Sequence, residues 1–479
     1  MGAADASTFF IRRQKMLTAG EKYKVEIVDM GQSGEGIGRV DGMAVFVDDA
    51  VVGDVCTVEI TKVKKNFAFG RLFEIDEPSE YRVVPECEYS RECGGCSLAA
   101  LDYEGQLILK QRQVKSVLER IGGVKDPEVL DIIGMEVPVY YRNNGQFPVG
   151  GNTENPSIGF YKAKTHYVVD CQDCMLQSEP AVTVAQVIRD YITQFGVSVY
   201  NGKTEKGTLR HLVVRNAEGT GEVMVVLVIN KGKLPEQETL VEWLKEAIDE
   251  IEPDEETGVK YKLRSFVLNI NQNKQGGAVM GDKNIFVYGQ ERITDNFEGI
   301  EYLISPRSFY QVNTKQAKKL YAKVAEFAEL TGKETVFDLY CGVGTISLYL
   351  ASKAKRVIGI EVVKDAILDA NRNAIKNGIV NAVFTCGKAE EVLPEMVLKG
   401  TRAHVAVLDP PRSGCDERLL KAVADAGVDR IVYVSCSPAT LARDVKKLKE
   451  MGYEFVKAQP VDMFPHSVHC EVVSLLSRK

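Results

Sequence analysis

Short apolar runs, each ending at a polar or glycine-rich turn, recur along the last third of the chain. They are rich in β-branched residues, and the clearest are residues 335–339, 356–360, 405–408 and 430–434. Apolar runs of this kind are typical of parallel strands in an open α/β sheet, which binds ligands at its carboxyl edge. We therefore expect a Rossmann-like domain over residues 299–479.

Residues 17–76 show a different pattern, in which short β-rich pieces alternate with many glycines. Many short strands at close spacing predict a small OB-like β-barrel. Cations and aromatic residues interleave near its end, as in surfaces that hold RNA backbone and stack bases. These residues are Lys62, Lys64, Lys65, Phe67, Phe69 and Arg71. A barrel that only packs on its neighbour is the other interpretation.

Residues 77–298 mix β-like segments with a helical stretch and form a predicted central α+β domain. The stretch 106–120 carries apolar residues at the spacing of a packing stripe, so we expect segment 97–125 to pack on the C-terminal domain. Its basic clusters, Tyr141–Asn144 and Arg210–His211, fit either RNA contacts or solvated strand edges.

Composition agrees with a multidomain α/β protein. A chain of 479 residues exceeds what one hydrophobic core usually supports. No apolar run approaches membrane-spanning length, and residues 1–15 lack a signal-peptide core, so we expect a cytoplasmic monomer. The net charge of −7 argues against a uniformly basic RNA-binding surface and favours local basic patches.

Three cysteines cluster at Cys87, Cys93 and Cys96, with glycines inside the close pair. A reducing compartment argues against disulfide bonds between these cysteines. Metal ligation, catalysis and packing remain as roles for them. A fourth ligand must come from elsewhere, and Cys171 and Cys174 are the local candidates. An iron–sulfur cluster and a four-thiolate zinc site both fit these residues.

The residues that follow the C-terminal runs are suited to chemistry. A turn with Gly342 and Gly344 follows the first run, and Glu361 ends the second. Such glycines let backbone approach a ligand, while an acid suits two ribose hydroxyls. Asp409 opens a proline-rich loop after the third run, and Cys436 follows the fourth. We expect these strand ends to meet at one crevice.

Six motifs carry a resemblance to a known family. In chain order they are SPRSFYQVN, DLYCGVGTISLYLA, IGIEVV, LDPPRSG, VYVSCSPATLARD and FPHSVHCE. Together they resemble the RNA uracil-5-methyltransferases, specifically the large-subunit ribosomal RNA group of the RumA type. The stretch GEGIGRVDGMAVFVDDAVVGD resembles a TRAM domain, an RNA-binding module. The resemblance covers nearly the whole chain.

The resemblance implies S-adenosylmethionine as methyl donor and RNA as substrate. It favours 23S ribosomal RNA, because the simpler transfer-RNA branch usually lacks both the TRAM domain and the cysteines; transfer RNA is the alternative. The implied donor-binding residues are Gln311, Tyr340, Gly342, Gly344, Glu361 and Asp409. The implied ligands of a 4Fe–4S cluster are Cys87, Cys93, Cys96 and Cys174, with Cys171 packed beside them.

The resemblance also assigns catalytic roles. Carbon 5 of uracil is a poor nucleophile, and a thiolate that adds to carbon 6 turns the base into an enolate. Cys436 is the expected nucleophile, and Glu471 the base that removes the carbon 5 proton. The target uridine must be unpaired or flipped out. His466 and His469 are interpreted as contacts to RNA or to the base.

Four other functions fit less well. A cytosine-5 methyltransferase typically has a cysteine directly after the first proline of the acidic loop, where this chain has Pro411. An adenine-amino methyltransferase needs an aromatic residue at Arg412, and a methylthiotransferase needs a three-cysteine radical motif that is absent. An RNA-binding module without catalysis would not need both Cys436 and Glu471.

Overall fold

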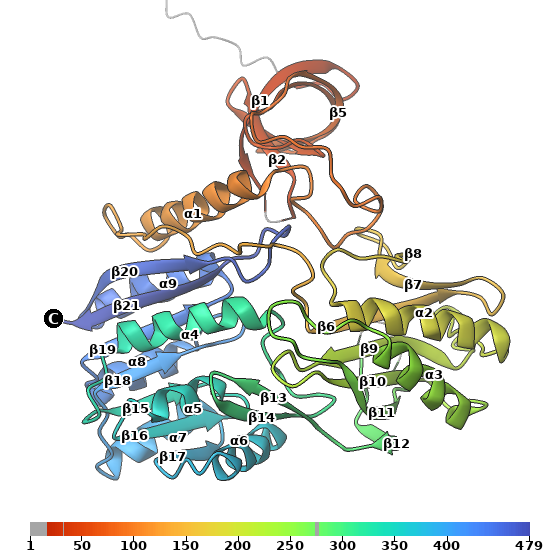
Figure 1. Ribbon diagram of the computed structural model, residues 1–479. Helices are drawn as coiled ribbons and strands as arrows, with labels where there is room; N and C mark the ends of the chain where they lie inside the picture. The colour runs from red at the N-terminus through yellow and green to blue at the C-terminus, as the bar shows by residue number, and fades with distance from the viewer. Residues whose placement is uncertain (1–16, 32, 274–276) are drawn as a thin grey trace, which may run out of the picture. The chain divides into compact units, whose positions relative to one another are not determined.

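The computed structural model describes residues 17–31, 33–273 and 277–479, which form two compact units (Figure 1). The smaller unit contains the chain up to Glu86 together with Ser97–Gly105 and His466–Val468. The larger unit contains Cys87–Cys96, Gln106–Pro465 and His469–Lys479. Residues 1–16, where a signal peptide was not expected, lie outside the described residues. No helix of the described chain is long and apolar enough to span a bilayer.

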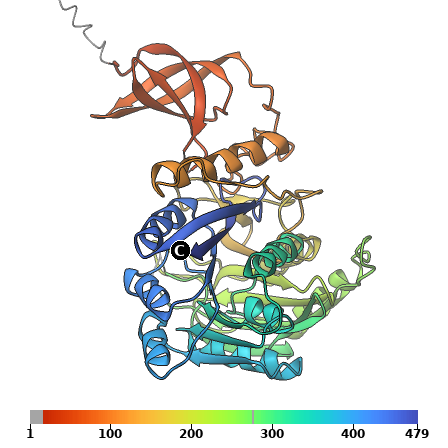
Figure 2. The same cartoon turned by 90° about the vertical axis from the view of Figure 1, so that its left-hand side faces the viewer.

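The smaller unit is built on a closed five-stranded barrel, which confirms the predicted barrel (Figure 2). Its strands are β1 (Lys22–Met30), β2 (Gly36–Val40), β3 (Met43–Asp48), β4 (Val55–Val63) and β5 (Phe67–Glu77). Closure requires glycine where strands crowd. A Cβ on Gly70 would lie 2.1 Å from a methyl group of Val58, and one on Gly38 would lie 2.2 Å from Val25.

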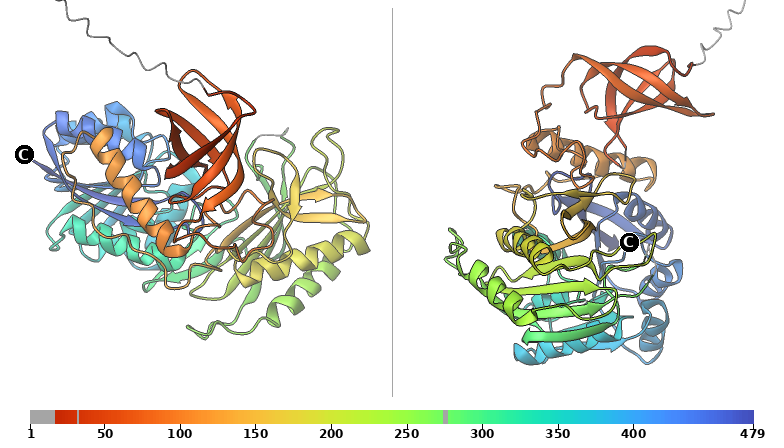
Figure 3. Two further views of the ribbon diagram at one scale, coloured as in Figure 1. Left: turned by 90° about the horizontal axis from the view of Figure 1, so that it is seen from above. Right: turned by 90° about the vertical axis from the view of Figure 1, so that its right-hand side faces the viewer.

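A seven-stranded sheet forms the first part of the larger unit, in the order β12-β11-β10-β9-β6-β7-β8. Its strands are β6 (Asn144–Gly151), β7 (Pro156–Tyr161), β8 (Val168–Asp170), β9 (Leu209–Asn216), β10 (Glu222–Ile229), β11 (Lys262–Ile270) and β12 (Lys283–Gly289). Helices α2 (Glu179–Gln194) and α3 (Gln237–Asp249) lie side by side on one face (Figure 3). Strand β10 is buried on both faces, because alternate residues along it join different cores.

The second seven-stranded sheet has the order β17-β16-β15-β18-β19-β21-β20 and confirms the Rossmann-like prediction. Its parallel strands are β15 (Thr335–Leu339), β16 (Arg356–Glu361), β17 (Ala382–Cys386), β18 (Val405–Leu408) and β19 (Arg430–Ser435). Strand β21 (Glu471–Arg478) runs antiparallel between β19 and β20 (Tyr453–Val461). The helices are α4 (Thr314–Ala328), α5 (Thr345–Ala351), α6 (Lys364–Lys376), α7 (Ala389–Leu398), α8 (Glu417–Ala426) and α9 (Pro438–Glu450).

A helix packs on the second sheet, and a hairpin joins the two sheets of the larger unit. Helix α1 (Tyr103–Arg120) places Val114 and Leu118 in the same core as Ala442 of α9. The hairpin of β13 (Ile293–Phe297) and β14 (Ile300–Ile304) spans the expected domain boundary at residue 298. Its buried side chains share a core with both sheets, so the two halves of this unit pack as one body.

Candidate active site

Cys436 lies at the carboxyl end of β19, where the chain turns into α9. Pro438 is the first residue of the helix, and its fixed φ suits that position. The turn is held by Ser435, whose Oγ accepts from the amide of Ser437 at 3.1 Å. Cys436 itself is only partly buried.

Glu471 lies at the same sheet edge as Cys436. Strands β19 and β21 pair antiparallel, and the last pair at this edge is Ser435 with Val472. Beyond this pair, Cys436 directly follows β19 and Glu471 begins β21, so both residues lie at the same edge of the sheet. Glu471 is 6% exposed, and its charge acts on the partly buried Cys436 thiol.

Burial and the repulsion between negative charges raise the pKa values of the ionisable groups at this site. Burial, followed by the charges of Glu471 and Asp409, raises the pKa of Cys436 to about 11, while Arg412 acts in the opposite direction. Burial and Asp409 raise the pKa of Glu471 to about 8. Burial and Asp338 raise the pKa of Asp409 to about 7. These interactions place the thiol, both acids and Arg412 in one electrostatic neighbourhood.

Arg412 is held by its loop and by a histidine. Its Nη2 lies 3.3 Å from Nε2 of His469, and a guanidinium only donates, so the imidazole accepts there and carries its proton on Nδ1. Burial, Arg412 and Lys110 lower the pKa of His469, which keeps the ring neutral. On the other side, Thr440 Oγ1 donates to the carbonyl of Arg412 at 3.2 Å. Sequence reasoning did not assign Arg412 a role, although its place in the DPPR segment was the available signal.

The glycine turn lies beside Glu361 at the ends of β15 and β16. Gly342 and Gly344 have φ of 54° and 84°, a left-handed conformation that favours glycine. The amide of Gly342 donates to Glu361 Oε2 at 3.2 Å, and that of Val363 donates to Oε1 at 2.9 Å. Glu361 is therefore oriented by backbone at the place where a ribose is expected.

Two predicted donor-binding residues flank this turn. Tyr340, with φ of 70°, donates its amide to the carbonyl of Ile360 at 2.9 Å and so lies between the ends of β15 and β16. Gln311 precedes α4 and lines a small, largely aromatic cavity together with Thr345, the first residue of α5. The structure therefore brings Gln311 near the glycine turn, although it lies far away in the sequence.

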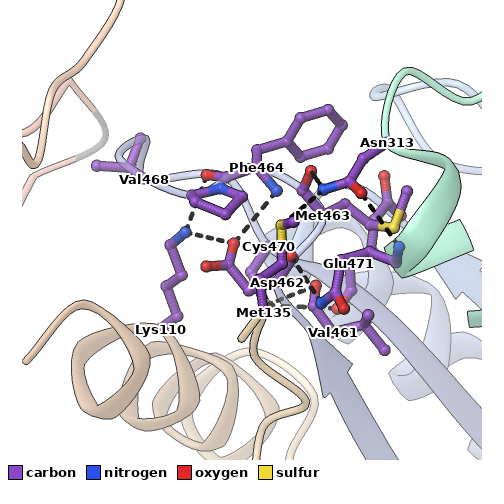
Figure 4. Close-up of polar contacts among 12 residues, drawn as sticks. Lys110, Met135, Asn313, Val461, Asp462, Met463, Phe464, Val468, Cys470 and Glu471 are labelled. Carbon is purple, nitrogen blue, oxygen red and sulfur yellow. Dashed lines mark hydrogen bonds and ion pairs between the residues drawn. The ribbon is translucent and has the colours of Figure 1, made fainter. Parts of the chain in front are cut away.

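A buried ion pair fixes the segment that leads to Glu471. Lys110 of α1 points at Asp462, with 2.6 Å between Nζ and Oδ1, and both side chains are fully buried (Figure 4). Lys110 Nζ also donates to the carbonyl of Phe464 at 3.1 Å. Asn313, the N-cap residue of α4, donates its Nδ2 to the carbonyl of Met463 at 3.1 Å. Helix α1 and the start of α4 thus hold the turn between β20 and β21.

The cysteine cluster lies in the larger unit. Cys96 interacts electrostatically with Cys174, Cys93 and Cys87, so the four predicted ligands lie near one another. The Cys93 sulfur accepts from the amide of Gly95 at 3.4 Å, and hydrogen bonding to Cys171 lowers the pKa of Cys93. No three His, Cys, Asp or Glu side chains in the described chain converge on a position for one metal ion. The sulfurs that hold a four-iron cluster bind different irons and need not converge on one position.

Comparison with known proteins identifies the family. The family model described as tRNA (Uracil-5-)-methyltransferase matches residues 243–479, and the TRAM domain model matches residues 17–73. A relative from Bacillus cereus is 44% identical over 94% of this chain and 95% of its own length. The chain belongs to the tRNA (uracil-5-)-methyltransferase family. A relative from Caldanaerobacter subterraneus is 45% identical over 96% of this chain and 98% of its own; both are named uncharacterized RNA methyltransferases.

A solved structure supports the same conclusion over nearly the whole chain. The Pyrococcus abyssi tRNA (uracil-54, C5)-methyltransferase, in complex with S-adenosyl-L-homocysteine, matches with a TM-score of 0.75 and 28% identity. The match covers 95% of this chain and 100% of that protein. This protein is therefore an RNA methyltransferase with S-adenosylmethionine as donor. Its membership of the uracil-5-methyltransferase family argues against the cytosine, adenine and methylthio alternatives.

Proposed function

We propose that this protein methylates carbon 5 of a uridine in RNA through a covalent bond between Cys436 and carbon 6. The observation that supports the proposal is that Cys436 follows β19 and Glu471 begins β21, two adjacent paired strands, and that the charge of Glu471 acts on the Cys436 thiol. A nucleophile and a base on adjacent strands can act on neighbouring carbons of one ring.

The residues then act in sequence. Cys436 gives its proton to solvent and its Sγ adds to carbon 6, so the electrons of the ring double bond move into an enolate. Carbon 5 would attack the methyl group of the bound donor, whose methyl–sulfur bond breaks as S-adenosyl-L-homocysteine leaves. Glu471 takes the proton from carbon 5, the ring double bond re-forms, and the bond between Sγ and carbon 6 breaks to release the Cys436 thiolate. The starting state returns when Glu471 releases its proton to solvent and Cys436 regains one.

Asp409 and Arg412 assist the reaction in different ways. With its pKa raised to about 7, Asp409 is substantially protonated near neutral pH and suited to donate to a carbonyl oxygen at the edge of the uracil. Arg412 lowers the pKa of both Cys436 and Glu471, so it favours their anionic forms. Gln311, Tyr340, Gly342, Gly344 and Glu361 would surround the methyl donor.

We also propose that Cys87, Cys93, Cys96 and Cys174 hold a 4Fe–4S cluster. Their proximity and the amide of Gly95 aimed at the Cys93 sulfur support this, because such hydrogen bonds stabilise cluster sulfurs. The cluster would have a structural role, since no residue of the methyl-transfer site belongs to this set.

The RNA target is proposed to be 23S ribosomal RNA, with transfer RNA as the second candidate. Domain content favoured the ribosomal target. The Pyrococcus abyssi enzyme, which is named for transfer RNA, matches 95% of this chain, so shared architecture also suits a transfer-RNA target.

The test is methylation of RNA from cells that lack this gene. We expect the protein and S-adenosylmethionine to form 5-methyluridine in 23S ribosomal RNA, mapped by mass spectrometry of RNase fragments. Cys436→Ala should abolish product while retaining affinity for S-adenosyl-L-homocysteine. Product in transfer RNA alone would select the second candidate, and product formed by Cys436→Ala would refute the covalent route.

A further inference from the structure

The turn between β7 and β8 is an unusual surface for this acidic protein. All seven residues from Tyr161 to Tyr167 are exposed, and none is acidic. Lys162, Lys164 and His166 supply hydrogen-bond donors and positive charge, and a tyrosine stands at each end. Tyr167 is 65% exposed, although aromatic rings normally gain free energy from burial.

The turn is ordered by its own contacts. The amide of Lys162 donates to the carbonyl of Tyr167 at 2.9 Å. Thr165 Oγ1 donates to the carbonyl of Lys162 at 2.9 Å and accepts from the amide of Tyr167 at 3.1 Å. The rings of Tyr161 and His166 meet edge to face, with 5.8 Å between centroids. A surface ordered in advance loses less conformational entropy when it binds.

The loop of residues 87–96, which we call the cysteine loop, packs against this turn. The amide of Gly94 donates to the carbonyl of Tyr161 at 3.1 Å, and Cys93 forms a β-bridge with Lys162. A Cβ on Gly94 would lie 3.0 Å from the Tyr161 carbonyl oxygen and 3.1 Å from the Ala163 backbone. Only glycine allows this approach without displacing the turn.

We infer that Tyr161–Tyr167 is an RNA-docking surface, in which Lys162 and Lys164 contact phosphates and Tyr167 and His166 stack on unpaired bases. Cations beside exposed rings match the two features of single-stranded RNA, a charged backbone and flat bases. The cysteine loop braces this surface, which gives the cysteine cluster a function in substrate binding. This inference rests on the proposed RNA substrate and names where part of it is held.

The first experiment measures binding of a fluorescent synthetic RNA stem–loop with uridines in its loop. K162A/K164A should weaken binding and reduce the slope of log Kd against log salt by about 1.4, because each phosphate contact on a single strand contributes about 0.7. Tyr167→Ala should weaken binding roughly tenfold with little change in salt slope. The control is K353A/K355A, which removes a second exposed Lys-Ala-Lys pair on the same unit and should leave both quantities unchanged.

Substitutions at two adjacent glycines test whether packing of the cysteine loop on this turn (the brace) is needed for RNA binding. Gly94→Ala should displace the turn and weaken RNA binding. Gly95→Ala should not, because its added methyl would meet only the Cys93 sulfur, at 3.4 Å. Iron content and thermal unfolding of both variants are measured alongside, so that loss of the fold is recognised. Equal binding by the two variants would overturn the brace.

Turnover separates this inference from the proposed function. At saturating RNA, K162A/K164A should form 5-methyluridine at the wild-type kcat with an increased KM. If the wild-type protein forms no 5-methyluridine, the proposed function fails while the binding comparison still decides the docking surface. Wild-type affinity and salt slope in K162A/K164A would overturn the docking surface, whatever the activity.

Discussion

Cys436 and Glu471 lie at one edge of the sheet because β19 ends just before the first residue and the adjacent strand β21 begins at the second. The sequence indicated each residue through its motif, and the apolar runs predicted where the strands end. The side chains that contact these residues in the fold could not be predicted. The contact between Arg412 and His469 joins residues 57 positions apart, and no local pattern marks such a pair. The same holds for Lys110 and Asp462, which are 352 positions apart.

Replacing Glu471 with Gln should trap the reaction after methyl transfer. Addition by Cys436 and methylation at carbon 5 do not need the carboxylate, whereas elimination requires removal of the carbon 5 proton. We expect a protein–RNA adduct that carries the methyl group and survives denaturing electrophoresis. The double variant with Cys436→Ala is the control and should give no adduct.

The pH dependence of the wild-type enzyme gives a second measurement on the same residue. Because burial and Asp409 raise the pKa of Glu471 to about 8, the group is protonated below that value and cannot accept a proton. The rate at which the methylated adduct breaks down should therefore rise as the pH increases through about 8, because this step needs the Glu471 carboxylate and no longer depends on ionisation of the Cys436 thiol. If the Glu471→Gln variant described above turned over normally, the residue that removes the carbon 5 proton would be a neighbour such as His469 and not Glu471.

At the scale of elements, local pattern predicted most strands but not their order. The apolar runs at 335–339, 405–408 and 430–434 became β15, β18 and β19 because their residues are buried on both faces of a sheet. The position of β21 between β19 and β20 could not be predicted from the sequence, because it depends on pairing between distant segments. Residues 129–133 likewise bridge to β20, an arrangement with no signal in their own composition.

The turn between β4 and β5 of the barrel should bind RNA. Lys62, Lys64 and Lys65 are exposed there, and the rings of Phe67 and Phe69 pack edge to face at 5.4 Å. Replacing the three lysines with alanine should weaken RNA affinity and reduce the salt slope by about 2, since each lost phosphate contact removes about 0.7. Fluorescence anisotropy across a salt series measures both. An unchanged slope, with the barrel still folded by circular dichroism, would mean that this turn has only a structural role.

At the scale of the whole molecule, the described chain forms two compact units where the sequence predicted three domains. The barrel could be anticipated because its glycines and short strands form a local pattern. The common packing of the two large sheets could not, because β10 and the hairpin of β13 and β14 contribute to cores shared with distant elements. The cysteine cluster depends on the same long-range packing, since Cys87–Cys96 and Cys174 come together only in the folded larger unit.

Iron content should distinguish the cluster from a zinc site. Protein purified without oxygen should be brown and contain about four iron atoms per chain, as expected for a 4Fe–4S cluster. Cys93→Ser should lose iron and lower the unfolding temperature, because the loop that packs on the β7–β8 turn would lose its anchor. Cys171→Ser is the matched control, since Cys171 contacts Cys93 without being a proposed ligand, and it should retain iron. Stoichiometric zinc without iron in anaerobic protein would replace the cluster with a structural zinc site held by the same thiols.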